Sequence, residues 1–239
     1  MYREFAKYYD KIYHRKNYKK EVRVLKKLIR RYKRSLGNDL LDLATGTGNH
    51  IAYFCDSFNC TGLDLNEEIL AVARSKGLNA TFVQGDMQDF NLQKQFEVIT
   101  CLFSSIGYLL TEAALEKAFK CIYHHLKPGG VVFIEPWLER EVYRVGSPHM
   151  EIYDDNDLKI ARLNVSELKR ESIAYFKMHY LVAERNKPVE YFVDEHELAL
   201  FPHSLLITKM QEVGLKTKVY AKGVFKRRTL LIGLKPEKG

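Results

Sequence analysis

The first 137 residues show short apolar runs that alternate with segments of helical periodicity. The apolar runs, each typical of a buried strand, cover residues 40–44, 60–65, 80–86, 96–103 and 131–137. The helical segments cover residues 3–15, 18–35, 49–57 and 112–125, with a further one that ends near residue 75. In the second of them Val22, Leu25 and Ile29 recur at the spacing of one helix face. Strands that alternate with helices favour a parallel sheet with helices on both faces.

The pattern changes after residue 137. Residues 149–198 contain aromatic-rich runs in which apolar and polar positions alternate, separated by the turn-like stretches "DDND" and "ERNKP". This alternation predicts three or four antiparallel strands. A helix over 203–213 and a hairpin made of "KTKVYAKG" and "RTLLIGLK" complete the predicted elements, and "LKPGG" (126–130) is predicted as a turn.

The length of 239 residues fits one α/β domain. We expect a doubly wound, mostly parallel seven-stranded sheet as its core. We expect a small antiparallel β insertion at 138–200 that covers the substrate, and an N-terminal helical lid at 1–36.

Positive charge is concentrated at the start of the chain. The net charge is +8, but residues 1–36 alone carry fourteen Lys and Arg against three acids, so the remainder is net −3. Such a segment could attract nucleic acid or an anionic substrate, although a solvated helix face in a charge-rich protein explains it more simply. No apolar run approaches the roughly 18–20 residues that a membrane span needs. We expect a cytoplasmic protein without a membrane partner, either a monomer or a homodimer.

The stretch "LLDLATGTGNH" (40–50) ends an apolar run in an acid and a loop with two glycines. A phosphate-binding P-loop is excluded because no lysine follows Gly46 or Gly48 in the required place. A dinucleotide fingerprint needs a third glycine, where Ile51 stands. S-adenosylmethionine has no phosphate, and needs only a tight turn at which the backbone approaches the ligand. Glycines allow that approach because they lack a Cβ.

Two acids follow where this ligand would need them. Asp64 ends the second predicted strand, 22 residues after Asp42, where a carboxylate can accept hydrogen bonds from both ribose hydroxyls. Asp86 follows the third strand and can accept from the adenine amino group, while the Met87 backbone N–H faces a ring nitrogen. Helix capping would explain one such acid. The glycine loop, Asp64 and Asp86 occur in the order that the ligand requires, and together they favour S-adenosylmethionine as the cofactor.

The stretches "DLATGTGNH", "GLDL", "QGDMQDF" and "LKPGG" resemble the class I S-adenosylmethionine-dependent methyltransferases. "YYDKIY", "FSSIGYL", "VVFIEPW", "HYLVA", "HELALF" and "RRTLLIGL" resemble the aminosugar N,N-dimethyltransferases within that class. The resemblance implies the Rossmann-like methyltransferase fold and methyl transfer to an amine, with S-adenosylhomocysteine as product. The chain departs from the family pattern at Thr45, where cysteine is frequent, and at Asp64, where glutamate is frequent. It also differs after Trp137 ("LEREV") and before Arg228 ("VFKR").

The same resemblance implies roles for three further residues. Tyr18 matches a cofactor-binding tyrosine, Tyr13 a tyrosine near the substrate amine, and Arg228 an arginine that meets nucleotide-sugar phosphates. Packing of Tyr13 on the core and a plain surface charge at Arg228 are the alternatives. The expected cofactor-binding residues are Tyr18, Asp42, Ala44, Gly46, Gly48, Asp64, Leu65, Asp86, Met87 and Leu102.

His179 is the second catalytic candidate beside Tyr13, because it lies in the added strands and could face the site. His196 is its rival, and a structural role is the commoner fate of a lone strand histidine. No metal is expected, since no His/Cys cluster has zinc spacing and a turn accounts for "DDND".

The sequence therefore predicts an S-adenosylmethionine-dependent methyltransferase that acts on a small amine, such as an amino sugar or a nucleotide-linked amino sugar. Two alternatives stay open. One is an RNA or protein methyltransferase that uses the basic N-terminal face, and the other is a non-catalytic protein that senses the cofactor. The methyl acceptor and the number of methyl groups transferred do not follow from the sequence.

Overall fold

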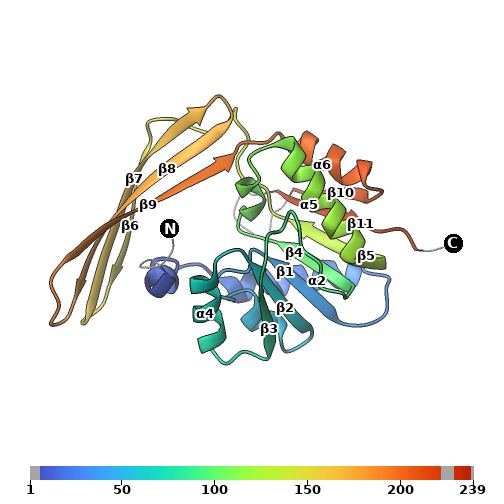
Figure 1. Ribbon diagram of the computed structural model, residues 1–239, viewed down its shortest axis with the longest axis horizontal. Helices are drawn as coiled ribbons and strands as arrows, with labels where there is room; N and C mark the ends of the chain where they lie inside the picture. Colours follow the sequence, from blue (N-terminus) through green and yellow to red (C-terminus); the bar gives the residue numbers. More distant parts are fainter. Residues whose placement is uncertain (1–5, 222–228, 238–239) are drawn as a thin grey trace.

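The computed structural model describes residues 6–221 and 229–237, and Arg228 lies outside them. Within the described residues the chain forms two sheets (Figure 1). The larger has seven strands in the order β10-β11-β5-β4-β1-β2-β3. Its strands are β1 (Asp39–Leu43), β2 (Asn59–Asp64), β3 (Ala80–Gln84), β4 (Phe96–Cys101), β5 (Leu126–Ile134), β10 (Lys216–Tyr220) and β11 (Leu230–Leu234). All neighbouring strands are parallel except β11, which is antiparallel to both β5 and β10.

The predicted doubly wound, mostly parallel sheet is confirmed. The helices are η1 (Ala6–Tyr8), α1 (Tyr9–Ile12), α2 (Tyr18–Tyr32), α3 (Ile51–Phe54), α4 (Glu67–Ser75), η2 (Ser105–Tyr108), α5 (Glu112–His125) and α6 (His203–Glu212). Adjacent residues of one strand point to opposite faces: Val98 of β4 packs in the cluster with α2 and α3, whereas Ile99 packs with α5 and α6. Chain order reverses between β1 and β4, and an open α/β sheet binds its ligand at such a point.

Side-chain caps fix where the helices begin. The side chain of Asn17 accepts a hydrogen bond from the Lys20 backbone N–H at the start of α2, and Asn66 caps α4 in the same way through Ile69. These bonds satisfy donors that the first helical turn leaves open.

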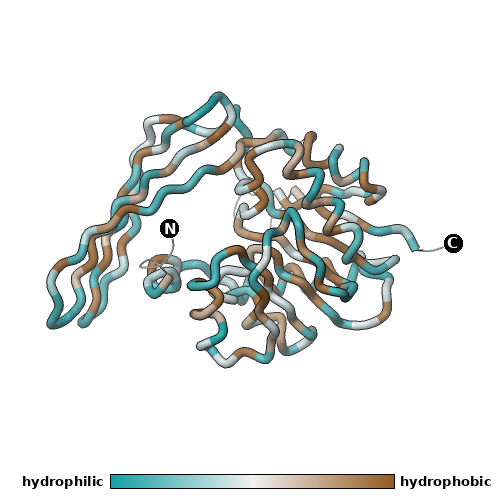
Figure 2. The backbone as a smooth tube through the Cα atoms, in the orientation of Figure 1, coloured by the Kyte–Doolittle hydropathy of each residue, from teal (hydrophilic) through white to brown (hydrophobic). Residues whose placement is uncertain are grey.

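The smaller sheet, called the β insertion below, has four antiparallel strands in the order β6-β7-β8-β9. They are β6 (Pro148–Asp154), β7 (Leu158–Arg170), β8 (Ile173–Glu184) and β9 (Glu190–Ala199). On β7 the buried positions include Arg162, Asn164 and Ser166, while Leu163 and Val165 are exposed. Figure 2 shows the main sheet as largely hydrophobic and the strands of the insertion as alternating between hydrophobic and hydrophilic residues. The inner face of the insertion is thus unusually polar.

Two sequence expectations about element boundaries are wrong. "LKPGG" is not a turn, because β5 begins at Leu126 and the pairing with β4 shifts register between Phe96 and Val98 to accommodate it. Gly129, with φ of 75°, lies in this irregular stretch. The predicted helix over 3–15 is broken into η1 and α1. None of the helices in the described part of the chain combines the length and apolar character needed to cross a bilayer.

The N-terminal residues divide into two parts. The apolar face of α2, including Val22, Leu25 and Ile29, is buried in the core against strands and α3. Residues 6–17, called the N-terminal segment below, instead contact the β insertion and α4. Among the described residues of the expected lid, residues 6–17 are the ones placed where a lid could close, because α2 is part of the core.

Candidate active site

A cavity of about 1330 Å³ lies at the carboxyl ends of the central strands, between the main sheet and the β insertion. Its floor includes Gly46 from the loop after β1, Asp64 at the end of β2 and Asp86 from the loop after β3. The N-terminal segment contributes Tyr13 and the insertion contributes Arg162. Residues from five separate parts of the chain therefore meet at the place where the fold favours a ligand.

The glycine loop, residues 44–50, is shaped by two left-handed glycines. Gly46 has φ of 58° and Gly48 has φ of 75°. A Cβ added at Gly46 would meet no atom within 4 Å, so it would project into open space beside the cavity. A Cβ at Gly48 would lie 3.1 Å from the Phe82 ring. The loop thus needs glycine at one position for a ligand's approach and at the other for packing.

Asp64 holds this loop while keeping acceptor capacity toward the cavity. Its Oδ2 accepts a hydrogen bond from Gly46 N at 2.8 Å, and its Oδ1 accepts one from Asn66 N at 3.0 Å. Burial raises the pKa of the Asp64 carboxyl. Each carboxylate oxygen has a further lone pair, which can accept from a vicinal diol such as that of a ribose.

Asp42 lies deeper, behind the glycine loop. It is 2% exposed and accepts hydrogen bonds from Thr45 Oγ1 at 2.9 Å and Thr100 Oγ1 at 2.6 Å. Burial raises the pKa of its carboxyl. With Tyr18, Ala44 and Leu102 it lines a small adjoining cavity of about 30 Å³. Asp42 therefore stiffens the loop and borders a narrow extension of the site.

The predicted adenine-side residues also reach the large cavity. Asp86 and Met87 line it directly after β3, and Leu65 lines it from the loop after β2. Asp86 Oδ1 accepts from Gln88 N at 2.8 Å, which fixes the turn. The structure thus brings the ten expected cofactor residues to the two adjoining cavities or, at Gly48, to the loop between them.

The sequence reasoning missed Asp10, which ties the N-terminal segment to the glycine loop. Its Oδ1 accepts hydrogen bonds from Thr47 Oγ1 at 2.6 Å and Asn49 Nδ2 at 2.7 Å. Its Oδ2 forms an ion pair with Lys76 at 2.7 Å. These partners lie 37 or more residues away, so no local pattern in "YYDKIY" could have pointed to them.

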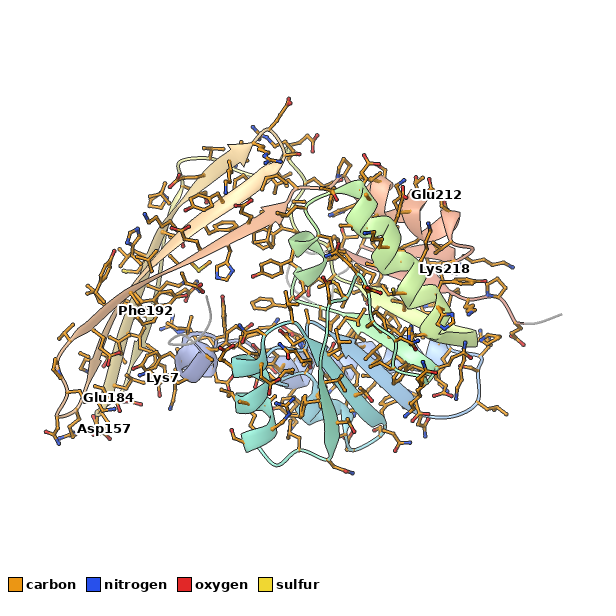
Figure 3. All side chains as sticks on the ribbon, viewed as in Figure 1. Lys7, Asp157, Glu184, Phe192, Glu212 and Lys218 are labelled. Atoms are coloured by element: carbon orange, nitrogen blue, oxygen red, sulfur yellow. The ribbon has the colours of Figure 1, made fainter. Side chains whose placement is uncertain are left out.

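The same segment also contacts the β insertion. The ring of Tyr8 stacks on that of Phe192 with centroids 6.4 Å apart, and Lys7 pairs with Glu190 at 3.8 Å. Figure 3 labels Lys7 on η1 and Phe192 on β9. The N-terminal segment thus bridges the glycine loop and the insertion.

Tyr13 lies in the cavity wall, in contact with a buried arginine. Its hydroxyl accepts a hydrogen bond from Arg162 Nη1 at 3.0 Å, and its ring meets Phe103 edge-on with centroids 5.2 Å apart. Arg162 is 8% exposed. Its Nε has no hydrogen-bond partner among the described residues. A ligand that accepts hydrogen bonds would satisfy this donor.

The loop after β4 is strained and is held by a second buried acid that the sequence did not reveal. Phe103 and Ser104 have φ of 53° and 66°, values uncommon for residues with side chains. Glu135, fully buried after β5, accepts from Phe103 N at 2.6 Å. Strain of this kind is retained where the surroundings over-determine it, often at functional sites.

The prediction that His179 faces the site is wrong. Its Nδ1 lies 2.7 Å from Tyr191 Oη in an exposed contact, outside the residues that line the cavity. His196 of β9 lines the cavity instead. The two side chains differ because they lie on opposite faces of one sheet, and successive residues of a strand alternate between faces. Arg228, the expected substrate contact, lies outside the described residues.

No group of three or more His, Cys, Asp or Glu side chains in the described ranges is arranged to hold a metal ion. The groups at Gly46 and Asp64 instead fit S-adenosylmethionine. The open approach at Gly46 accommodates a ligand beside the backbone, and Asp64 presents a carboxylate to the cavity.

Comparison with known proteins agrees with this geometry. A methyltransferase-domain family model matches residues 40–130. The chain is 33% identical to dTDP-3-amino-3,6-dideoxy-alpha-D-glucopyranose N,N-dimethyltransferase of Streptomyces fradiae, over 99% of this chain and 92% of that relative. It is 33% identical to DesVI of Streptomyces venezuelae, whose crystal structure matches with a TM-score of 0.84 over 92% of each chain.

A further solved structure carries the cofactor. The S-adenosylmethionine-bound structure of an amino pentose methyltransferase from Micromonospora echinaspora is 26% identical and matches with a TM-score of 0.81 over 92% of each chain. The expected cofactor is therefore confirmed as S-adenosylmethionine, and the chain is an enzyme that transfers methyl groups from it. It belongs to the class I S-adenosylmethionine-dependent methyltransferases, in the group of the aminosugar N,N-dimethyltransferases.

Proposed function

We propose that this enzyme methylates the amino group of an amino sugar that is linked to a nucleotide. The observation that carries the proposal is the cavity of about 1330 Å³. A pocket for one drug-sized ligand occupies about 300–1000 Å³, so this cavity has room for the cofactor and a second small molecule together. The relatives of this chain are named for dTDP-linked amino sugars.

The polar inner face of the β insertion supports a sugar as the second ligand. Arg162, Asn164 and Ser166 are each buried and line the cavity. They offer donors and acceptors that match hydroxyl groups. The β insertion is therefore proposed as the substrate-covering part of the enzyme.

A polymeric substrate is less well supported. Half of the N-terminal Lys and Arg residues, seven of fourteen, lie on α2, yet Glu21 is the one residue of that helix that lines the large cavity in the described part of the chain. The basic face of α2 is thus separate from the cavity, where Arg15 and Lys16 are the N-terminal basic residues, and this separation favours a small acceptor over RNA or protein.

We propose residue roles from the positions of these side chains around the two cavities. Asp64 would accept from the ribose hydroxyls of the cofactor, Asp86 from its adenine amino group, and Tyr18 would border its amino-acid end. The bound cofactor supplies an electrophilic methyl group. The protein holds the acceptor nitrogen in line with it and keeps water out, which converts a bimolecular step into an effectively unimolecular one.

The test is methyl transfer from labelled S-adenosylmethionine to a panel of acceptors. A dTDP-linked amino sugar should be methylated faster than the free amino sugar, and the corresponding sugar without an amino group should not be methylated. Transfer to bulk RNA or protein with none to any amino sugar would refute the proposal.

The N-terminal segment is proposed to close over bound cofactor. Asp10 links it to the glycine loop, so a ligand that orders the loop should also order the segment. Trypsin should cleave at Lys11, Arg15 and Lys16 more slowly when S-adenosylhomocysteine is present. Cleavage at Arg185, in the turn between β8 and β9, provides the control and should not change. Equal slowing at both places would mean general stabilisation rather than a lid.

Tyr13→Phe should keep substantial activity. The change removes one hydroxyl, and an oriented hydrogen bond contributes about 0.5–1.5 kcal/mol, or at most about tenfold in rate. Loss of a general base would instead cost about 10²–10⁴-fold. Single-turnover rates with saturating cofactor distinguish the two, and a decrease beyond about a hundredfold would make Tyr13 a proton acceptor.

A further inference from the structure

We infer that Tyr108, His196 and Asp194 form a proton relay that takes a proton from the ammonium group of the methyl acceptor. The inference rests on the proposed function, because it requires an amine acceptor. Tyr108 is the catalytic residue, since it lines the cavity and would contact the amine. His196 and Asp194 act through it.

The three side chains are connected in a row. Tyr108 Oη lies 3.1 Å from His196 Nδ1, and His196 Nε2 lies 2.7 Å from Asp194 Oδ2. Asp194 is 2% exposed and His196 is 7% exposed. The carboxylate fixes the ring so that Nε2 donates to Asp194 while Nδ1 accepts from the tyrosine hydroxyl. The relay therefore has a defined direction, from the cavity to the buried acid.

Tyr108 is held at the place where the chemistry must occur. It ends η2, in the loop that follows β4 and that Glu135 restrains at Phe103. Tyr108 lines the same cavity as Asp64, on the expected cofactor side, and Tyr13, on the expected acceptor side.

A relay would assist the reaction because an aliphatic ammonium ion, with an ordinary pKa near 10 as in lysine, has no lone pair for attack until it loses a proton. In the proposed step the ammonium N–H bond breaks and its proton passes to Tyr108 Oη. The proton of that hydroxyl moves to His196 Nδ1, and the electron pair of the broken bond stays on nitrogen. The imidazolium so formed faces the carboxylate of Asp194, and later returns the proton to solvent. A second methylation at the same nitrogen would need one more such transfer.

Both uncharged and titratable side chains surround His196 on the β insertion. On β8 the residue paired with His196 is Phe176, which is uncharged. The ring of Phe176 packs against Trp137 and Tyr143 from the loop after β5. Besides His196, the described titratable side chains of the β insertion that line the cavity are Glu195 and Glu197 of β9, Tyr175 of β8, Arg162 of β7, and His149 and Glu151 of β6. Asp194 is the acid that lies within hydrogen-bond distance of His196.

A merely structural role is the alternative, in which the three residues fasten the β insertion to η2. The two roles differ in their pH dependence. A proton relay makes kcat depend on its own ionisation, whereas a fastening role lowers kcat equally at every pH or acts on KM.

The experiment measures kcat against pH for two nucleotide-linked amino sugars whose amines differ in pKa. The wild-type enzyme should give one midpoint for both acceptors. In His196→Gln the midpoint should rise and follow the acceptor, with kcat reduced about 10²–10⁴-fold well below the amine pKa and largely restored above it. Tyr108→Phe should shift the midpoint in the same way. This second variant keeps the test valid if His196→Gln does not fold.

His179→Gln is the matched control, because it changes the same residue type in the same sheet on the opposite, exposed face. Its profile should equal that of the wild type. Parallel profiles for wild type and His196→Gln, or a wild-type midpoint that already follows the acceptor, would overturn the relay while leaving the amino-sugar function in place. Failure of the wild type to methylate any amine would overturn both.

Discussion

Asp64→Ala is expected to weaken S-adenosylmethionine binding by about 1.5–3 kcal/mol, or roughly 10- to 160-fold, because hydrogen bonds to a charged acceptor are lost. The carboxylate also accepts from Gly46 N and Asn66 N, so the variant loses an organiser of the glycine loop as well as a ligand contact. Calorimetric titration measures the change. An affinity within about twofold of wild type would remove Asp64 from the cofactor site.

The ionisation of the Asp64 carboxyl should also make cofactor binding depend on pH. Burial raises the pKa of Asp64, and the ionised form is the one that accepts from the ribose. Affinity should therefore be fully present above that pKa and be lost as pH falls through it, at higher pH than an ordinary aspartate titrates. Asp64→Asn should abolish this dependence.

Asp56→Asn is the matched control for both measurements. Asp56 is an exposed aspartate paired with Lys26, which lowers the pKa of its carboxyl. Binding and its pH profile should be unchanged in this variant. A loss of affinity there would indicate a global effect of altered charge rather than a contact made by Asp64.

The sequence predicts the main sheet well because its central strands are buried on both faces. Runs such as 40–44 and 96–103 are mostly apolar, interrupted by Asp42 in the first and by Glu97 and Thr100 in the second, and each is followed by a loop whose polar residues must then lie at one edge. That edge is where parallel strands bind ligands. Gly46, Asp64 and Asp86 could therefore be placed together without knowledge of any contact.

The same reasoning from apolar runs fails for the β insertion. In an ordinary half-buried sheet the apolar residues mark the inner face, but here Arg162 and Ser166 are buried while Leu163 and Leu181 are exposed. With apolar residues on both faces, the pattern could not tell whether His179 or His196 faces the cavity. The pairing register decides it, because His196 pairs with Phe176, and Phe176 and His179 lie on opposite faces of β8.

Glu21→Ala is expected to destabilise the protein by about 3–5 kcal/mol, because removing one partner of a buried ion pair leaves the others uncompensated. Glu21 is 7% exposed and lies 2.7 Å from Lys16 Nζ through Oε1 and 2.9 Å from His50 Nε2 through Oε2. For a chain of this size the melting temperature should fall by about 6–20 °C.

This loss should reach the site, because the three residues link α2, the N-terminal segment and the glycine loop. Lys16 also lies 4.4 Å above the Phe103 ring, and the Tyr18 ring meets that of His50 at 4.9 Å. In Glu21→Ala the N-terminal segment should therefore be cleaved faster by trypsin even with S-adenosylhomocysteine present.

Glu67→Ala provides the comparison. Glu67 pairs with Arg74 on the exposed side of α4, where the two side chains are 50% and 42% exposed. A surface pair contributes about 0–1 kcal/mol, so this variant should melt within about 4 °C of wild type. Thermal unfolding of both variants in one buffer makes the contrast direct. If the two melting temperatures fell equally, the Glu21 cluster would contribute no more than a surface pair, and the N-terminal segment would have to be held mainly by Asp10.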